Sequence, residues 1–469
     1  MSLTSALNSA MSGLAAAGRA SLIVSDNIAN AATPGYGRRS LEVATDANIG
    51  SGVRVLGVTR HSDPALIASR RVADADHAGA DVRAGFYQDL QRLVDGSLDG
   101  QSLTARLAGF ENALIAAASA PESAVRLDSL AQAAIGLANG ISGAAQGVQS
   151  LRSDADRAVG GMIEQLNSGL QAVQKLNTQI AAAGPDGAAA ALMDQRQVIL
   201  DQINQIVPVN VVDRTHGHVA LYTDGGAILL DGSAAELGFD PAPLVTPYMT
   251  AQGGDLSGFT IGDMPIRSDA LRGGALQAQI QIRDELGPQM AQQLDALTAD
   301  LITRFEDSGL DPTRMAGDPG LFTDAGAPMD PTALTGLATR LQVVAGIEDN
   351  AWRLRDGLGA AVQGDLGNAA LLHGLSDALT QGRMVDGRLQ SAGDLTADLV
   401  AGVAAQVHAA DQTLSFAAVG REELQRLELE QGVDTDTELQ TLMLVERAYA
   451  ANARIVQAVD EMMQTILRI

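Results

Sequence analysis

The end of the chain, 435-TDTELQTLMLVERAYAANARIVQAVDEMMQTILRI-469, carries a sustained helical repeat. Its apolar side chains recur at alternating spacings of three and four residues, which is the pattern of a coiled-coil seam. Thr435 and Glu438 fit the two ends of a capping box, so we expect the helix to begin there. Asn452 is a polar residue of the kind that fixes register within a seam. The seam residues are Leu442, Val445, Tyr449, Asn452, Val456, Val459, Met463 and Ile466.

The first 32 residues carry a second repeat of the same kind at the opposite end of the chain. Small residues dominate this seam, and Gly13 and Gly18 weaken the helix further, so we expect it to be stable only when packed. Pro34 and Gly35 fit the centre of a type II turn that ends the helix. The seam residues are Leu3, Leu7, Ala10, Leu14, Ala17, Ser21, Val24 and Ile28. Two terminal helices with apolar stripes are expected to pair with each other and to self-assemble.

The sequence between the termini predicts a mainly α protein. Aromatic residues make up 3% of the chain, so the cores must consist of Leu, Ile, Val and Ala, which suits long packed helices. Residues 40–60 alternate as in a β-hairpin, whereas 64–206 show helical periodicity. Residues 207–270 read as short strands, a helix resumes near Ala275 with a kink at Pro288, and helical sequence returns from about Pro331.

These patterns divide the chain into four expected regions. Residues 1–40 and 435–469 form a terminal coiled-coil domain. Residues 41–206, 271–306 and 333–434 form a helical bundle. Residues 207–270 form a small inserted β-rich region, and 307–332 form an acidic loop rich in Asp-Pro pairs.

Composition argues against several classes of function. The 31 basic and 56 acidic residues give a formal charge of −25, which disfavours nucleic-acid binding. There are no cysteines, so thiol catalysis, disulfides and Cys-ligated metals are excluded. The N-terminus does not resemble a cleaved secretory leader, and no apolar run is long enough for membrane insertion.

No catalytic or cofactor-binding pattern stands out. His216 and His218 are two residues apart in an expected strand and could share a metal, but no third ligand is near them. Asp434 and Asp436 lack the spaced ligands of a calcium loop and fit an acidic helix cap better. Phosphate-loop and nucleophile-elbow patterns are absent. We therefore expect no enzyme activity, no cofactor, and no catalytic or metal site.

Both ends of the chain and part of its middle resemble a known family. Residues 25–38, SDNIANAATPGYGR, resemble the N-terminal signature of bacterial flagellar rod, hook and hook-associated axial proteins. Residues 446–454, ERAYAANAR, with 459–462, VDEM, resemble the matching C-terminal signature. Residues 192–196, LMDQR, and 200–207 resemble the hook-associated members that join the hook to the filament. The N-terminal signature residues are Asn27, Asn30, Thr33, Pro34, Gly35, Tyr36 and Arg38.

The resemblance implies a structural subunit of the flagellum. Such a subunit would form a ring with copies of itself at the hook–filament junction, in contact with hook protein on one side. A second hook-associated protein and the filament would lie on the other side. The family implies secretion through the flagellar type III export apparatus, with a cytoplasmic chaperone at the C-terminal helix, and an inner tube of paired terminal helices. The short 307–332 segment implies a reduced outer domain.

Two alternatives remain. The chain could be another axial subunit of the family, from the distal rod or the hook, in which case residues 60–205 would be β structure. It could also be a secreted adhesin or enzyme on a flagellar scaffold, which would require a deep pocket at His216 and His218.

Overall fold

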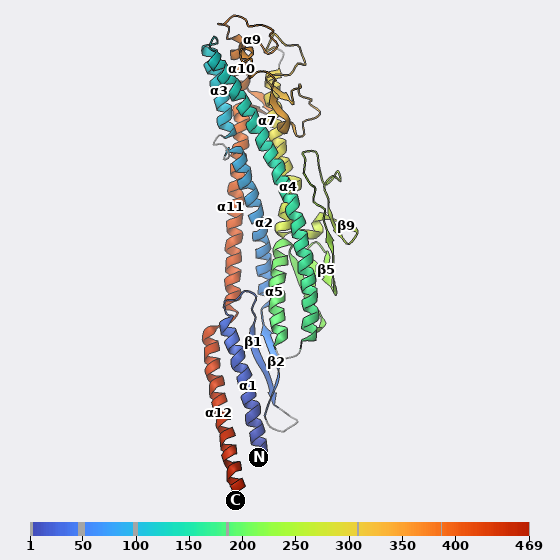
Figure 1. The fold of residues 1–469 in the computed structure, drawn as a ribbon, viewed down its shortest axis with the longest axis vertical. Helices are drawn as coiled ribbons and strands as arrows, with labels where there is room; N and C mark the ends of the chain where they lie inside the picture. The colour runs from blue at the N-terminus through green and yellow to red at the C-terminus, as the bar shows by residue number, and fades with distance from the viewer. Residues whose placement is uncertain are drawn as a thin grey trace.

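The computed structural model describes residues 3–45, 52–96, 102–183, 187–306, 309–385 and 387–468. Figure 1 shows an elongated molecule whose two termini lie together at one end. A pair of terminal helices and a hairpin form that end, long helices form the middle, and short elements cover the opposite end. The mainly α architecture with small antiparallel sheets confirms the expected fold class. No helix within the described ranges is long and apolar enough to cross a membrane.

The terminal unit consists of α1 (Leu3–Ala29), α12 (Thr435–Arg468), β1 (Arg38–Thr45) and β2 (Val53–His61). The two helices pack against each other along their length, as the seams predicted, and they run antiparallel; the hairpin lies against α1 (Figure 1). Helix α1 ends where Asn30 N–H donates to the Asp26 carbonyl, three residues earlier than the repeat suggested. Gly35 has φ of +79°, and Tyr36 N–H donates to the Thr33 carbonyl, so the expected turn forms.

Long helices form the bundle above this unit. Asp63 caps the first of them and Pro64 occupies its first position, while Ser391 and Asp394 form a capping box at the last. The longest helix packs against both its predecessor and its successor, and the last bundle helix packs along the first. The helices are α2 (Pro64–Val94), α3 (Leu103–Ser119), α4 (Ala124–Ala182), α5 (Ala188–Ile206) and α11 (Ala392–Glu430).

A π-helical turn, η3 (Ile282–Leu286), joins α6 (Gly274–Gln281) to α7 (Gly287–Glu306). The irregular turn thus ends just before Pro288, the residue at which the sequence predicts a kink. The buried Arg152 side chain presses against this turn and its Nε donates to the Arg283 carbonyl at 2.9 Å. A Cβ on Gly287 would lie 2.5 Å from Arg152 Cγ, so the turn and its glycine accommodate the arginine.

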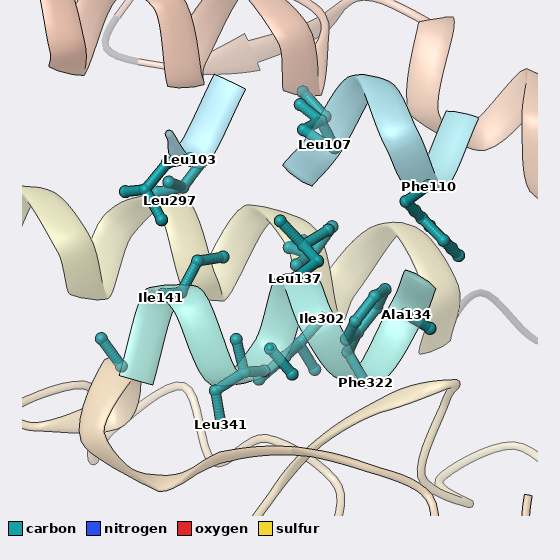
Figure 2. Packing of buried hydrophobic residues seen from close by; sticks show 14 of the residues in the cluster. Leu103, Leu107, Phe110, Ala134, Leu137, Ile141, Leu297, Ile302, Phe322 and Leu341 are labelled. Carbon is teal, nitrogen blue, oxygen red and sulfur yellow. The ribbon is translucent and has the colours of Figure 1, made fainter. Parts of the chain in front are cut away.

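The larger core lies at the far end of the bundle, between α3, α4 and α7 (Figure 2). Phe322 is fully buried there and makes edge-on contacts with Phe110 and Phe305. Phe322 belongs to β10 (Phe322–Asp324), which pairs with β11 (Leu341–Val343). The segment 307–332 is thus more than the loop that its Asp-Pro composition suggested: within its described part it contributes a strand and core residues.

Residues 333–369 also differ from expectation, because they lack a long helix within their described length. Besides the strand β11, their only helices are the four-residue α8 (Leu337–Arg340) and α9 (Arg353–Asp356). Gly336, Gly346 and Gly357 adopt positive φ, which an α-helix cannot continue through. After them come α10 (Ala370–Thr380), β12 (Arg383–Val385) and β13 (Arg388–Gln390).

The β-rich region lies beside α4 and α5 and has its own apolar core (Figure 1). Its two antiparallel sheets have the orders β3-β4-β5-β6 and β7-β8-β9. His216 has φ of 58° in the 3₁₀ turn η1 (Thr215–Gly217), so the prediction that it lies in a strand was wrong. The elements are β3 (Val209–Asp213), β4 (Val219–Thr223), β5 (Ile228–Asp231), β6 (Ser233–Ala234), β7 (Leu237–Gly238), β8 (Phe259–Ile261), β9 (Met264–Ile266) and the 3₁₀ turn η2 (Ser268–Leu271).

Candidate functional site: the polar junction between the terminal helices and the bundle

Asn27 is the centre of a buried polar cluster near the end of α1. Its side chain is fully buried, yet every polar atom has a partner. Its Oδ1 accepts from the Tyr36 hydroxyl at 2.8 Å and from Arg39 N–H at 3.0 Å. Its Nδ2 donates to the Arg39 carbonyl at 2.9 Å and to Glu438 Oε2 at 3.1 Å. One amide thereby joins α1, the signature turn, β1 and α12.

Glu438 connects the start of α12 to the same cluster. Its side chain is 1% exposed, and its Oε1 accepts from Arg38 Nε at 2.7 Å. The capping-box prediction was therefore wrong, because this carboxylate points into the buried polar cluster around Asn27 and not toward the start of its own helix. Asp434 caps α12 instead, accepting from the N–H groups of Asp436 and Thr437. The acidic-cap interpretation of Asp434 is the one that the structure confirms.

Asp194 on α5 connects the hairpin to the bundle. Its carboxylate accepts from Gly37 N–H at 3.0 Å and pairs with Arg39 Nη2 at 2.5 Å and Arg60 Nε at 2.7 Å. The Arg39 guanidinium also lies 4.7 Å from the centre of the Tyr36 ring, in a cation–π contact. Burial raises the pKa of the Tyr36 phenol despite the nearby Arg39, so its hydroxyl stays a hydrogen-bond donor at neutral pH.

The polar contacts continue across the connection between α11 and α12. Arg60 Nη2 donates to Gln197 Oε1 at 2.5 Å, and Gln197 Nε2 donates to Glu428 Oε1 at 3.1 Å. Glu428, near the end of α11, pairs with Arg70 of α2, which also pairs with Asp201 at 2.7 Å. Burial opposes the charge on Arg70, but its three carboxylate neighbours raise its pKa above the ordinary value.

The remaining signature residues form the turn that places Tyr36, Arg38 and Arg39 next to Asn27. Asn30 Nδ2 donates to the Asp26 carbonyl, and Thr33 Oγ1 donates to Asn30 Oδ1. Pro34 is exposed at the corner of the turn. The Gly35 carbonyl accepts from Arg60 Nη2 at 3.1 Å. We call Asn27, Tyr36, Arg38, Arg39, Arg60, Asp194 and Glu438 the polar junction.

The seam residues lie along the contact between α1 and α12. Ala10, Ala17 and Val24 are buried on α1, and its other five seam residues are half-buried. On α12, Val459 is buried and Leu442, Val445, Asn452 and Val456 are half-buried. Tyr449, Met463 and Ile466 remain exposed. Asn452 packs on Gly13, where an added Cβ would lie 2.7 Å from its Nδ2.

Sequence reasoning missed Asp194, Gln197, Arg60 and Glu428 as parts of one site. Glu438 was the clearest indication of this site in the sequence. It lies four residues before Leu442, so it continues the seam and places a carboxylate on the helix face that becomes buried. Across the described residues, no group of three or more His, Asp or Glu side chains is arranged to hold a metal ion. The arrangement is suited to fixing two helical units against each other.

Comparisons with known proteins identify the class of protein that carries this arrangement. The family model "Flagella basal body rod protein" matches residues 7–36, and "Flagellar basal body rod FlgEFG protein C-terminal" matches residues 430–469. The model "Flagellar hook-associated protein FlgK helical domain" matches residues 88–321. The chain belongs to the family of bacterial flagellar rod, hook and hook-associated proteins. Within that family its middle matches the helical domain of the hook-associated proteins.

Individual relatives bear the name flagellar hook-associated protein 1. The Escherichia coli K12 protein is 27% identical over 60% of this chain and 53% of the relative. The Salmonella typhimurium LT2 protein is 31% identical over 50% of this chain and 44% of the relative. The chain thus spans about half the length of these two relatives. The Bacillus subtilis 168 protein is 22% identical over 98% of this chain and 97% of its own length.

One solved structure, described as the flagellar hook junction protein FlgK from Burkholderia pseudomallei, is also similar. It matches 55% of this chain and 47% of its own, with a TM-score of 0.44 and 19% identity.

Proposed function

We propose that this chain is a structural subunit of the bacterial flagellum that joins the hook to the filament and is needed for filament assembly. The observation that carries the proposal is the paired terminal helices, which extend beyond the bundle and keep apolar side chains exposed (Figure 1). Leu444 is 63% exposed and Ile466 is 60% exposed on α12, and Leu22 is 69% exposed on α1. Exposed apolar residues recur along α12 from Leu439 to Ile466, and such a concentration of apolar side chains marks an interaction site.

In the proposed assembly, copies of the chain form a ring whose paired α1 and α12 build the inner tube. The seam residues of both helices hold each pair together, and their exposed flanks contact neighbouring copies. Hook protein lies on one side of the ring, and the second hook-associated protein and the filament lie on the other. The polar junction supports this role because it fixes the helix pair to the bundle through ion pairs that need no large apolar interface.

The proposal includes delivery to that location. Secretion through the flagellar type III apparatus, with a chaperone on the C-terminal helix beforehand, suits terminal helices that have small seams. Gly13, Gly18 and the alanines of α1 leave little apolar area to bury, so the helix pair unfolds locally at low cost.

A distal-rod or hook subunit is the second candidate within the family. A rod or hook subunit would have β structure in residues 60–205. The described residues 64–94, 103–119 and 124–182 are helical instead. The match to the hook-associated helical domain also favours the junction role. An adhesin or enzyme on the same scaffold has no supporting observation.

Deletion of residues 442–469 in the host bacterium tests the proposal. We expect the truncated chain to be produced and the hook to form, while filament subunits are released into the medium. The matched control deletes residues 383–389 of the β12–β13 hairpin, which connects α10 to the start of α11 at the end of the bundle away from the terminal helices (Figure 1). Normal filaments on cells with the 442–469 deletion would overturn the junction role.

A further inference from the structure

The terminal unit and the bundle share no apolar core within the described residues. The two apolar clusters lie in the bundle, at its far end and in the β-rich region, and neither includes a side chain of α1, α12, β1 or β2. The chain passes between the two units at residues 62–63 and 431–434 (Figure 1). Each unit is therefore packed internally, and the boundary between them depends on other contacts.

One turn of α5 supplies polar contacts across this boundary. Asp194 accepts from Gly37 N–H and pairs with Arg39 and Arg60, and Gln197 accepts from Arg60 Nη2 at 2.5 Å. The Asp194 side chain is 15% exposed, so water reaches its carboxylate. Ion pairs that remain partly hydrated contribute modestly to stability and weaken as salt is added.

The apolar contacts at the boundary leave room for movement. Val198 of α5 lies against Gly35 but is still 40% exposed. A hollow of about 220 Å³ lies between the signature turn and the end of α11, with Pro34, Leu429 and Val433 in its lining. The signature turn therefore has space to shift toward α11 while both units stay folded.

We propose that Asp194 and Gln197 form a releasable latch, and that residues 62–63 and 431–434 form the hinge that the latch controls. When the latch is closed, the terminal unit continues the bundle as one rod, as in Figure 1. When it opens, the terminal unit turns as one body, because Asn27 and Glu438 hold α1, β1 and α12 together on their own side of the boundary. One chain can thus adopt two angles between its units without unfolding. This inference goes beyond the proposed function and does not depend on it.

Spin labels test the latch on the full-length chain, which has no cysteine of its own. Val419→Cys/Ile455→Cys places one label on α11 and one on α12, at side chains that are 67% and 44% exposed. Double electron–electron resonance then gives the distribution of distances between the two units. In this labelled parent chain, Asp194→Asn should enlarge a second, broader component by roughly tenfold, because two partly buried ion pairs lose their charge.

Asp201→Asn is the matched control for this substitution. Asp201 lies on the same helix, its side chain is 19% exposed, and it pairs with two guanidinium groups. Those groups, Arg70 and Arg71, both belong to α2 of the bundle, so these ion pairs do not cross the boundary. Asp201→Asn should therefore leave the distance distribution of the labelled parent chain unchanged.

A second label pair, Leu22→Cys/Ile455→Cys, reports on the terminal unit alone. Its distribution should stay narrow with Asp194→Asn, because the unit turns as one body. The inference is overturned if Asp194→Asn leaves the first distribution unchanged, if Asp201→Asn widens it equally, or if the second pair widens as well. A labelled parent chain in which the broad component is already as large also overturns it. These measurements use the free chain, so none of these outcomes changes the proposed place of the protein in the flagellum.

Discussion

Arg38 and Glu438, four hundred residues apart in the chain, form an ion pair of 2.7 Å in which the carboxylate is almost completely buried. Arg38 belongs to the strand that follows the N-terminal signature, and Glu438 lies in the first turn of the C-terminal helix. The pair ties the two ends of the chain together at the point where they meet the bundle. The pair contributes to stability because its carboxylate is buried and also accepts a hydrogen bond from Asn27 Nδ2.

Replacing Glu438 with Gln should loosen the start of α12. The change removes the charge that Arg38 pairs with and places an amide donor near Asn27 Nδ2. We expect a loss of roughly 1–3 kcal/mol, since Arg38 is 35% exposed and partly hydrated. Hydrogen exchange of α12 amides measures it. The control, Glu461→Gln at an exposed site on the same helix, should leave the exchange rates of α12 unchanged. Equal effects of the two variants would show that the buried ion pair does not stabilise the start of α12.

Gly13 and Gly18 provide a matched pair of substitutions on α1. Alanine normally stabilises a helix by roughly 0.5–1 kcal/mol over glycine. Gly18→Ala should show that gain, because nothing lies within 4 Å of the added Cβ. Gly13→Ala should instead destabilise the helix pair, because its Cβ would lie 2.7 Å from Asn452 Nδ2. Hydrogen exchange of α1 in the two variants compares them, and a gain at both positions would contradict the observed packing at Asn452.

Tyr36 should make the polar junction sensitive to alkali. Its phenol pKa is raised above the ordinary value of 10.0, chiefly by burial. Because the folded state holds this proton more tightly than the unfolded state, the associated stability is complete below the unfolded pKa and is lost as pH rises through the folded value. Hydrogen exchange of β1 measured across that range should accelerate. Tyr36→Phe should cost about 1 kcal/mol at neutral pH and remove that part of the alkaline dependence; an unchanged pH profile would exclude Tyr36 as its source.

Arg152→Met should destabilise the bundle beside the β-rich region. The guanidinium is 2% exposed and donates to the carbonyls of Thr246, Met249 and Arg283. Loss of these donors leaves buried acceptors unpaired, at about 1–3 kcal/mol for each acceptor that water cannot reach. Urea unfolding measures the effect. Arg157→Met, an exposed position on the same helix, is the control; a similar small loss in both would mean that water replaces Arg152.

The long elements were predictable because their apolar spacing persists over many turns. The seams of α1 and α12 and the hairpin between residues 38 and 61 follow local rules of periodicity and turn chemistry. The polar junction was not predictable in the same way. Asp194 and Arg60 are far apart in sequence, and nothing local pairs one arginine with one aspartate among so many acidic residues. Glu438 fitted a capping box by local rules, but in the folded chain its carboxylate forms the tertiary ion pair with Arg38 instead.

Short helices and strands were also not predictable from the sequence. Phe322 lies in a segment whose Asp and Pro residues resemble a loop, and its strand exists because β11 and the aromatic core stabilise it. Residues 333–369 contain apolar side chains at helical spacing, but positive-φ glycines divide them into single turns. Tertiary packing determines the secondary structure of such segments, because local propensity is too weak to determine it.

A cryo-electron microscopy map of the hook–filament junction from the host bacterium tests the central claim most directly. We expect a ring of this chain between hook and filament, with α1 and α12 paired along the channel and the bundle outside them. The polar junction should then lie at the boundary between the two layers, with Glu438 next to Arg38. A map that shows the chain absent from the junction, or its bundle helices lining the channel, would contradict the account.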